Sequence, residues 1–280
     1  MQIGLIAGAG ELPLIIAGDA KDRGYRVVTV ALENLASEHL KALSDEFRWV
    51  NPGKFGELID TFKKHRVNEA IMAGKVPKSL LYKSKITPDL RALKLLFSIR
   101  DKSDDAILNA ITKELASEGI EIVDTLKFSP HLLTPEGCLT KKGPDDEEWK
   151  DIEFGWKIAK EIGKLDIGQT VVIKGRAVMA VEAIEGTDEA ILRGGKLAGE
   201  NAVVVKVSKP QQDMKLDVPA VGLDTLKSME KVRARVLAVE SQRSMIVSRE
   251  KVIEEAERAG ISIVGISAEK VRRGKAGINR

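Results

Sequence analysis

The chain has 280 residues, of which 43% are hydrophobic; this length suits two domains, and this apolar content excludes wholesale disorder. Its 45 basic and 42 acidic side chains leave a net charge of only +3, and 4% of the residues are aromatic, so a nucleic-acid-binding surface is not expected. Cys138 is the single cysteine, which excludes an internal disulfide and a cysteine-rich metal site and indicates a reducing cytoplasm.

The apolar N-terminus, MQIGLIAGAGELPLIIAGDA, does not resemble a targeting segment. It lacks the basic stretch of a signal peptide, and Glu11 and Pro13 interrupt it. No run in the chain reaches about 18 uninterrupted apolar residues, so no transmembrane helix is expected. Attachment to a membrane surface stays open.

The first 130 residues alternate between short apolar runs and amphipathic segments. This order predicts a mainly parallel sheet covered by helices on both faces, as in a Rossmann-like domain. The strands are predicted at Gln2–Ala7, Arg26–Ala31, Glu69–Ala73 and Ile120–Asp124, and the helices from Pro13 to Gly24, at Phe55–His65 and at Ser103–Ser117.

The composition changes between Ser129 and Asp151, where prolines, glycines and a charged run accumulate. We therefore predict an α/β protein with an N-terminal domain at 1–130, a linker at 131–150 and a mixed α/β catalytic domain at 151–280. Its helices are predicted at Ile152–Ile162, Thr225–Val232 and Arg249–Ala259, and its strands at Thr170–Lys174, Val178–Glu182, Ala202–Val207, Arg235–Val239, Met245–Val247 and Ile261–Val264.

Two turns in the first half suit phosphate binding. In IAGAGELP, Gly8 and Gly10 lie between a strand and a helix, where backbone N–H groups and the helix dipole favour an anion. Only two glycines of the dinucleotide pattern GxGxxG are present, so a plain tight turn is the alternative. Lys75 follows another strand and would lie at the carboxyl edge of the sheet, unless it is an ordinary solvated lysine.

Three carboxylate-bearing motifs are candidates for chemistry. Asp104 and Asp105 in SDDAIL suit the first turn of a helix, which needs no function to explain it. VEAIEGTDEAILR gathers acidic residues as a Mg²⁺ or acid/base cluster would, although a hairpin loop also explains it. KVSKPQQDMKLDVPAVG mixes aspartates and lysines in an irregular segment, as cation and phosphate sites do, although a solvated loop is again the alternative.

These blocks, in this order, resemble the LpxI-type UDP-2,3-diacylglucosamine pyrophosphatases of lipid A synthesis. The resemblance implies a Mg²⁺-dependent hydrolase that yields UMP and 2,3-diacylglucosamine 1-phosphate (lipid X), with water attacking the glucosamine-side phosphorus. It implies two α/β domains that hold the substrate between them, and a cytoplasmic protein peripheral to the inner membrane of a Gram-negative bacterium. Asp217 corresponds to an aspartate that is essential in the family. Lys102-Ser103-Asp104-Asp105 departs from the GDD that members often carry.

The motifs and the resemblance together assign the site. Competing hypotheses are a non-catalytic nucleotide-sugar or dinucleotide-binding Rossmann-like protein and a nicotinamide oxidoreductase, and a homodimer stays open. The predicted catalytic residues are Asp217, Asp213 and Glu182; the predicted Mg²⁺ ligands are Asp217, Glu185 and Asp188; and substrate contacts are expected from Gly8, Gly10, Lys75, Asp105, Thr187, Asp188, Arg193, Lys206 and Lys209.

Overall fold

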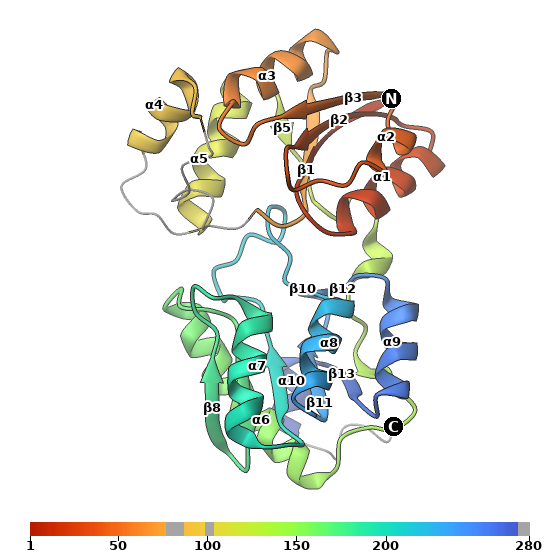
Figure 1. Cartoon of the computed structure of the whole chain (residues 1–280), viewed down its shortest axis with the longest axis vertical. Coiled ribbons are helices and arrows are strands. Elements are labelled where there is room, and N and C mark those ends of the chain that lie inside the picture. The colour runs from red at the N-terminus through yellow and green to blue at the C-terminus, as the bar shows by residue number, and fades with distance from the viewer. Residues whose placement is uncertain (77–86, 99–103, 274–280) are drawn as a thin grey trace. The chain divides into compact units, whose positions relative to one another are not determined.

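The computed structural model describes residues 1–76, 87–98 and 104–273 and divides the chain into two compact units (Figure 1). The N-terminal unit comprises Met1–Pro130 together with Asp213–Asp217, and the C-terminal unit comprises His131–Gln212 and Val218–Arg280. None of the helices in the described ranges has the length and the apolar content that crossing a bilayer requires.

Five parallel strands form the sheet of the N-terminal unit, in the order β3-β2-β1-β4-β5, which confirms the predicted parallel α/β fold. The half-exposed edge strand β3 has the sequence EFRWV, and without an apolar run it escapes prediction. The strands are β1 (Gln2–Ala7), β2 (Arg26–Leu32), β3 (Glu46–Val50), β4 (Glu69–Ala73) and β5 (Glu121–Ile122), and the helices are α1 (Leu12–Asp22), α2 (Leu40–Leu43), α3 (Phe55–Lys64), α4 (Leu90–Ser98) and α5 (Asp104–Ser117).

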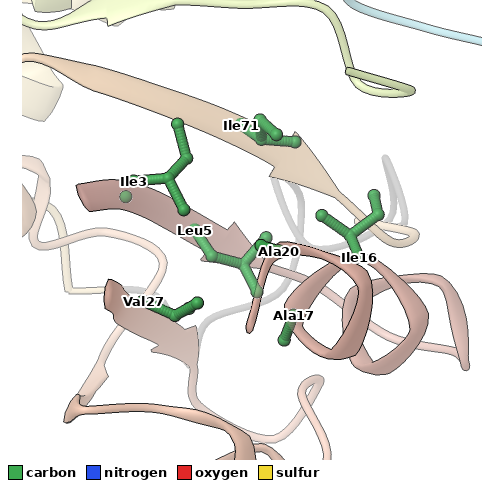
Figure 2. A pocket seen from close by; sticks show the side chains of 8 residues that line it. Ile3, Leu5, Ile16, Ala17, Ala20, Val27 and Ile71 are labelled. Atoms are coloured by element: carbon green, nitrogen blue, oxygen red, sulfur yellow. The ribbon is translucent and has the colours of Figure 1, made fainter. Parts of the chain in front are cut away.

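Helix α1 packs closely on this sheet. Figure 2 shows Ile16, Ala17 and Ala20 of α1 turned toward the strands that carry Leu5 and Ile71. The small alanines let the helix approach, and the side chains leave no cavity large enough for a water molecule. Burial of each large apolar side chain contributes about 1.5–3 kcal/mol. This interface is therefore core packing, not a ligand pocket.

The C-terminal unit contains a mixed six-stranded sheet in the order β6-β13-β11-β9-β7-β8, with β9, β11 and β13 parallel. Helix α6 packs on one face of the sheet, and α7, α8 and α9 pack on the other. The strands are β6 (Gly137–Cys138), β7 (Thr170–Lys174), β8 (Ala177–Val181), β9 (Val203–Lys206), β11 (Val236–Glu240) and β13 (Ser262–Ile266), the separate pair is β10 (Ala220–Val221) with β12 (Met245–Ile246), and the helices are η2 (Pro130–Leu132), α6 (Asp146–Lys164), α7 (Thr187–Ala198), α8 (Leu223–Lys231), α9 (Arg249–Arg258) and α10 (Ala268–Arg273).

The segment 131–150, predicted as a linker, is an integral part of the C-terminal unit. Strand β6 pairs with β13, and the hydroxyls of Thr134 and Ser244 form a buried hydrogen bond of 2.9 Å. Helix α6 begins within this segment, because Asp145 and Glu148 form a capping box at its N-terminus. The acidic run DDEE, which suggests a solvated linker, complements the helix dipole instead.

Candidate active site

The turns after β1 and β4 lie together at the carboxyl edge of the N-terminal sheet. These strands are neighbours, and the chain order of the sheet reverses between them, which is where open α/β sheets bind ligands. Gly8 follows β1 and Lys75 follows β4, so two predicted substrate contacts flank this point. The Lys75 residue is exposed.

The backbones of the two turns are joined. The amide of Gly8 donates to the carbonyl of Ala73 at 2.8 Å, and Ala9 and Lys75 exchange two N–H···O bonds of 2.9 and 2.8 Å. A Cβ on Gly8 would lie 2.8 Å from the Lys75 carbonyl oxygen, so the close approach requires glycine. The amides of Gly8 and Ala9 are thus used within the unit, and a phosphate contact at Gly8 or Gly10 stays a prediction.

Residues Asp213–Asp217 are held by the N-terminal unit, although the sequence predicts them in the C-terminal domain. Thr125, which follows β5, donates its amide and its hydroxyl to the carbonyl of Lys215, both at 3.0 Å. The same hydroxyl lies 3.3 Å from the carbonyl oxygen of Met72 in β4. Leu216 packs against the hydrophobic core of this unit. The segment is therefore fixed at the carboxyl ends of β4 and β5.

Asp213 shapes the turn that presents Asp217. Its carboxylate accepts the amide of Lys215 at 2.9 Å, and its carbonyl accepts the amides of Leu216 and Asp217 at 3.1 and 3.0 Å. Asp213, predicted as catalytic, thus stabilises the turn through these hydrogen bonds. The side chain of Asp105, in the first turn of α5, lies outside the described part of the chain.

Three polar side chains stand side by side on neighbouring strands of the C-terminal sheet. Thr170 of β7 pairs with Lys206 of β9, and its carbonyl accepts the amide of Glu182, just after β8, at 2.8 Å. Residues opposite one another on antiparallel strands point to the same face. Thr187 lies over this row: its hydroxyl donates to Glu182 Oε1 at 2.8 Å and accepts from Lys206 Nζ at 2.9 Å. The structure therefore brings together the predicted residues Glu182, Thr187 and Lys206.

Lys206 is buried within this cluster. Besides Thr187, its ammonium donates to the carbonyl of Ala220 in β10 at 2.8 Å. Glu182 is also buried and accepts the amide of Gln169 at 3.2 Å. These contacts tie the N-terminus of α7 to three strands, so Lys206 and Glu182 order the EGTD turn in addition to any role with a substrate.

Three buried oxygen atoms near this cluster have no hydrogen-bond partner among the described residues: Gln169 Oε1, Thr170 Oγ1 and Asp188 Oδ1. Buried polar atoms are normally satisfied, so these oxygens suit ordered water or a ligand. Gln169 and Thr170 were not predicted from the sequence. The sequence signal for Thr170 is its position at the start of a predicted strand, β7. The two antiparallel neighbours of this strand end at Lys206 and directly before Glu182.

Arg193 and Glu185 form an ion pair beside the EGTD turn. Arg193 Nη2 lies 2.5 Å from Glu185 Oε1 and also donates to the carbonyl of Val181 at 2.8 Å. The hydrogen bond from Arg193 is the main cause that lowers the pKa of Glu185 below its ordinary value. Glu185 is thus an anion held by a protein cation, which makes it a poor additional ligand for a metal ion.

The loop after β9 is clamped by a buried carboxylate. Glu240 Oε2 accepts the amide and the hydroxyl of Ser208 at 2.7 and 2.8 Å. Lys160 donates to both oxygens of Glu240 and to the Ser208 carbonyl at 2.9 Å, and burial lowers the pKa of this lysine. The adjoining Lys209 forms an ion pair with Asp166. Lys209 is therefore charge-compensated within the C-terminal unit.

The described residues contain no group of three or more histidine, cysteine, aspartate or glutamate side chains that could hold a metal ion. In the EGTD turn, Glu182 and Glu185 are engaged by other protein groups, and Asp188 has the buried oxygen without a partner. Mg²⁺ commonly uses one or two carboxylates and takes its other oxygens from water and substrate phosphates. The EGTD turn thus offers one carboxylate, that of Asp188, to an ion that is also held by substrate phosphates. It does not offer enough free carboxylates to hold a metal ion alone.

A separate hollow of about 340 Å³ lies at the amino ends of β9, β11 and β13, lined in part by Asn201, Arg233 and Gly260. Lys206 and Glu240 lie at the opposite, carboxyl ends of these strands. None of the predicted site residues lines the hollow. We therefore place no active-site chemistry there.

Among solved structures, phosphoribosylglycinamide synthetase from Anaerococcus prevotii is 13% identical with a TM-score of 0.27, over 61% of this chain and 31% of that one. The biotin carboxylase domain of a single-chain bacterial carboxylase is also 13% identical, with a TM-score of 0.28, over 66% and 38% of the two chains. The matched parts span about a third of both larger proteins. Similarities this low support no inference about fold or function.

The family comparisons cover both units. Residues 2–132 match the LpxI N-terminal domain, and residues 135–264 match the LpxI C-terminal domain. The chain is 31% identical, over 280 aligned residues, to the UDP-2,3-diacylglucosamine pyrophosphatase LpxI of Caulobacter vibrioides, covering 96% of this chain and 99% of that protein. The chain therefore belongs to the LpxI family.

Proposed function

We propose that the protein is a UDP-2,3-diacylglucosamine pyrophosphatase of lipid A biosynthesis. The reaction adds water across the P–O–P linkage: one P–O bond breaks, and the products are UMP and 2,3-diacylglucosamine 1-phosphate, or lipid X. The observation that carries this proposal is the match over nearly the full length of both chains to the Caulobacter pyrophosphatase.

The proposed catalytic residue is Asp217. Hydrolysis of a pyrophosphate needs a positioned water and groups that compensate negative charge as the P–O bond breaks. In this account the Asp217 carboxylate orients the attacking water and accepts its proton. Support comes from the docking of its segment at the carboxyl ends of β4 and β5, in the unit where Gly8 and Lys75 flank the reversal of strand order. Lys75, exposed at this edge, is the proposed partner for a phosphate oxygen.

A dependence on Mg²⁺ is part of the proposal. When bound to the pyrophosphate, the ion would offset negative charge on the phosphate oxygens. The residue of the C-terminal unit proposed to contact it is Asp188, whose buried Oδ1 has no partner among the described residues. Glu185, predicted as a ligand from the sequence, is left out because Arg193 holds its carboxylate.

We also infer that the protein works in the cytoplasm at the surface of the inner membrane. A substrate with two acyl chains resides in a lipid phase, so an enzyme that hydrolyses it must meet that phase. The exposed apolar side chains of α4 in the N-terminal unit support such an encounter.

The proposal is tested by incubating the purified protein with UDP-2,3-diacylglucosamine and Mg²⁺ and separating the nucleotides by chromatography. The expected products are UMP and lipid X in equal amounts. Release of UDP would mean cleavage of the glycosidic bond instead, and no release of a nucleotide would contradict the proposal. UDP-glucose, which carries no acyl chains, serves as the control substrate and should be hydrolysed far more slowly.

A further inference from the structure

Helix α4 is firmly attached to the N-terminal unit along one side. Asp89 caps it by accepting the amide of Ala92 at 2.8 Å, and its second oxygen accepts the amide of Gly56 in α3 at 2.8 Å. Ala92 is buried, and Leu95 packs against the core. Figure 1 shows α4 beside α3 and α5, and the helix is packed against both. The opposite side of α4 is therefore presented outward in a fixed orientation.

The outward side of α4 is apolar, contrary to the usual pattern of a surface helix. Leu90 and Phe97 are 79% and 85% exposed, and Leu93 and Leu96 between them are also exposed. At about 100° per residue, these four side chains cover about 120° of the helix circumference without a polar interruption. We call them the α4 apolar face. Single exposed leucines are ordinary, but a continuous face on one helix marks an interaction site.

Basic residues lie on α4 and, in the sequence, on either side of it. Lys94 is exposed at its rim, whereas Arg91, farther round the helix, pairs with Glu118. In the sequence, the stretch 77–102 that contains α4 has seven basic and two acidic residues, a local charge of +5, which leaves −2 for the rest of the chain. The positive charge of the sequence is thus concentrated in the stretch that contains this helix.

We propose that the α4 apolar face docks on an anionic lipid bilayer. Leu90 and Phe97 enter the boundary between headgroups and acyl chains, while Lys94 stays at the level of the anionic headgroups, as in interfacial amphipathic helices. The choice of partner rests in part on the proposed function, because a diacylated substrate is taken from a lipid phase. The apolar face and the local charge support it independently of any activity.

A second copy of the chain is a poorer occupant for this face. Stable protein interfaces bury about 800 Å² on each partner, whereas a nine-residue helix is only about 13 Å long and offers four apolar side chains. The exposed Lys94 at the rim would also meet the same charge on a symmetry-related copy. Both arguments favour a lipid surface over a dimer.

The test is cosedimentation of the full chain with vesicles in the absence of substrate. The wild type is expected to bind vesicles of phosphatidylethanolamine and phosphatidylglycerol, and to bind phosphatidylcholine vesicles weakly. The double variant Leu90→Ser/Phe97→Ser should bind about tenfold or more weakly. The control Leu165→Ser/Leu197→Ser changes two exposed leucines of the C-terminal unit and should bind like the wild type. Lys94→Glu should weaken binding at low salt, and its control Lys196→Glu should not.

Equal vesicle binding by the wild type and the Leu90→Ser/Phe97→Ser variant would overturn the proposal. The proposal would also be overturned if light scattering showed that the wild type is a dimer and the variant a monomer, while both bind lipid equally. Release of UMP from a short-chain, water-soluble substrate should be unchanged in the variant, whereas release from substrate embedded in vesicles should fall. If neither protein hydrolyses the soluble substrate while vesicle binding still depends on α4, the proposed function fails and the docking surface stands.

Discussion

Thr125 holds the carbonyl of Lys215 with both its backbone amide and its hydroxyl, each at 3.0 Å. Ninety residues separate the two positions, and this contact fixes the segment that ends at Asp217 to the N-terminal unit. The proposed catalytic carboxylate is thus carried by a unit other than the one that its place in the sequence suggests.

Thr125→Val should lower kcat with little effect on KM, because the buried hydroxyl no longer fixes the segment while the substrate contacts stay. We expect a decrease of about fivefold, in keeping with the loss of roughly 1 kcal/mol of hydrogen bonding. Thr125→Ser keeps the hydroxyl and should recover most of the rate. Thr61→Val removes a buried hydroxyl that bonds to Glu57 in α3 and serves as the control. Equal kcat values for Thr125→Val and Thr61→Val would show that the Thr125 contact does not position Asp217.

Thr187→Val should destabilise the C-terminal unit by about 1–3 kcal/mol. The variant removes the hydroxyl shared by Glu182 and Lys206 and leaves these buried charged groups short of a partner. Denaturation can be followed by fluorescence in a Trp49→Phe background, where both remaining tryptophans, Trp149 and Trp156, lie in the core of this unit.

Thr187→Ser retains the hydroxyl and should unfold close to the parent protein. Thr112→Val, which loses only a hydrogen bond to Leu108 within α5, is the control for removal of a threonine hydroxyl. If Thr187→Val were as stable as this control, the hydrogen bonds of the Thr187 hydroxyl to Glu182 and Lys206 would not stabilise the unit.

The Glu185–Arg193 pair should stabilise the protein near neutral pH and not in acid. Because its pKa is lowered in the folded state, Glu185 contributes stability above its unfolded pKa and loses it as the pH falls through the folded pKa. The pair is partly exposed, so its coupling energy should stay below about 1 kcal/mol. A double-mutant cycle of Glu185→Gln and Arg193→Gln, measured by denaturation across this pH range, gives that energy. A coupling that persists when Glu185 is protonated would be inconsistent with the ion pair.

Chelation should abolish hydrolysis, and added Mg²⁺ should restore it. Asp188→Asn should raise the Mg²⁺ concentration needed for half-maximal rate by about tenfold, because one carboxylate is lost from the shared ion. Asp224→Asn, on the exposed first turn of α8, is the matched control and should keep the wild-type Mg²⁺ dependence. Full activity in excess EDTA would remove the metal from the mechanism.

Much of the fold follows from local sequence pattern. The run Gln2–Ala7, the glycine turn and the helix after it predict β1 and α1, because a buried parallel strand needs a continuous apolar run. The sequence also singled out Glu182, Thr187 and Lys206 one by one, although it did not predict the contacts that join them. Such strands and helices can be predicted because the residues next to them in the sequence determine whether they are buried and which conformation they adopt.

The parts that escaped prediction depend on distant partners. The docking of Leu216 into the N-terminal core is decided by Thr125 and the core itself, and nothing in DMKLD encodes it. The carboxylate of Glu185 is engaged by Arg193, eight residues farther on, and the acidic motif alone does not show this ion pair. The segment 131–150 resembles a linker in composition, yet β6 finds its partner β13 more than a hundred residues later.

The central claim is that Asp217, held on the N-terminal unit, drives hydrolysis of the acylated UDP-sugar. The most direct test is the rate of UMP release by Asp217→Asn, compared with Asp224→Asn and with binding of the intact substrate. The account predicts a loss of about a thousandfold or more in rate, with substrate binding and folding retained and the Asp224→Asn rate unchanged. An Asp217→Asn protein that releases UMP as fast as the wild type would contradict it.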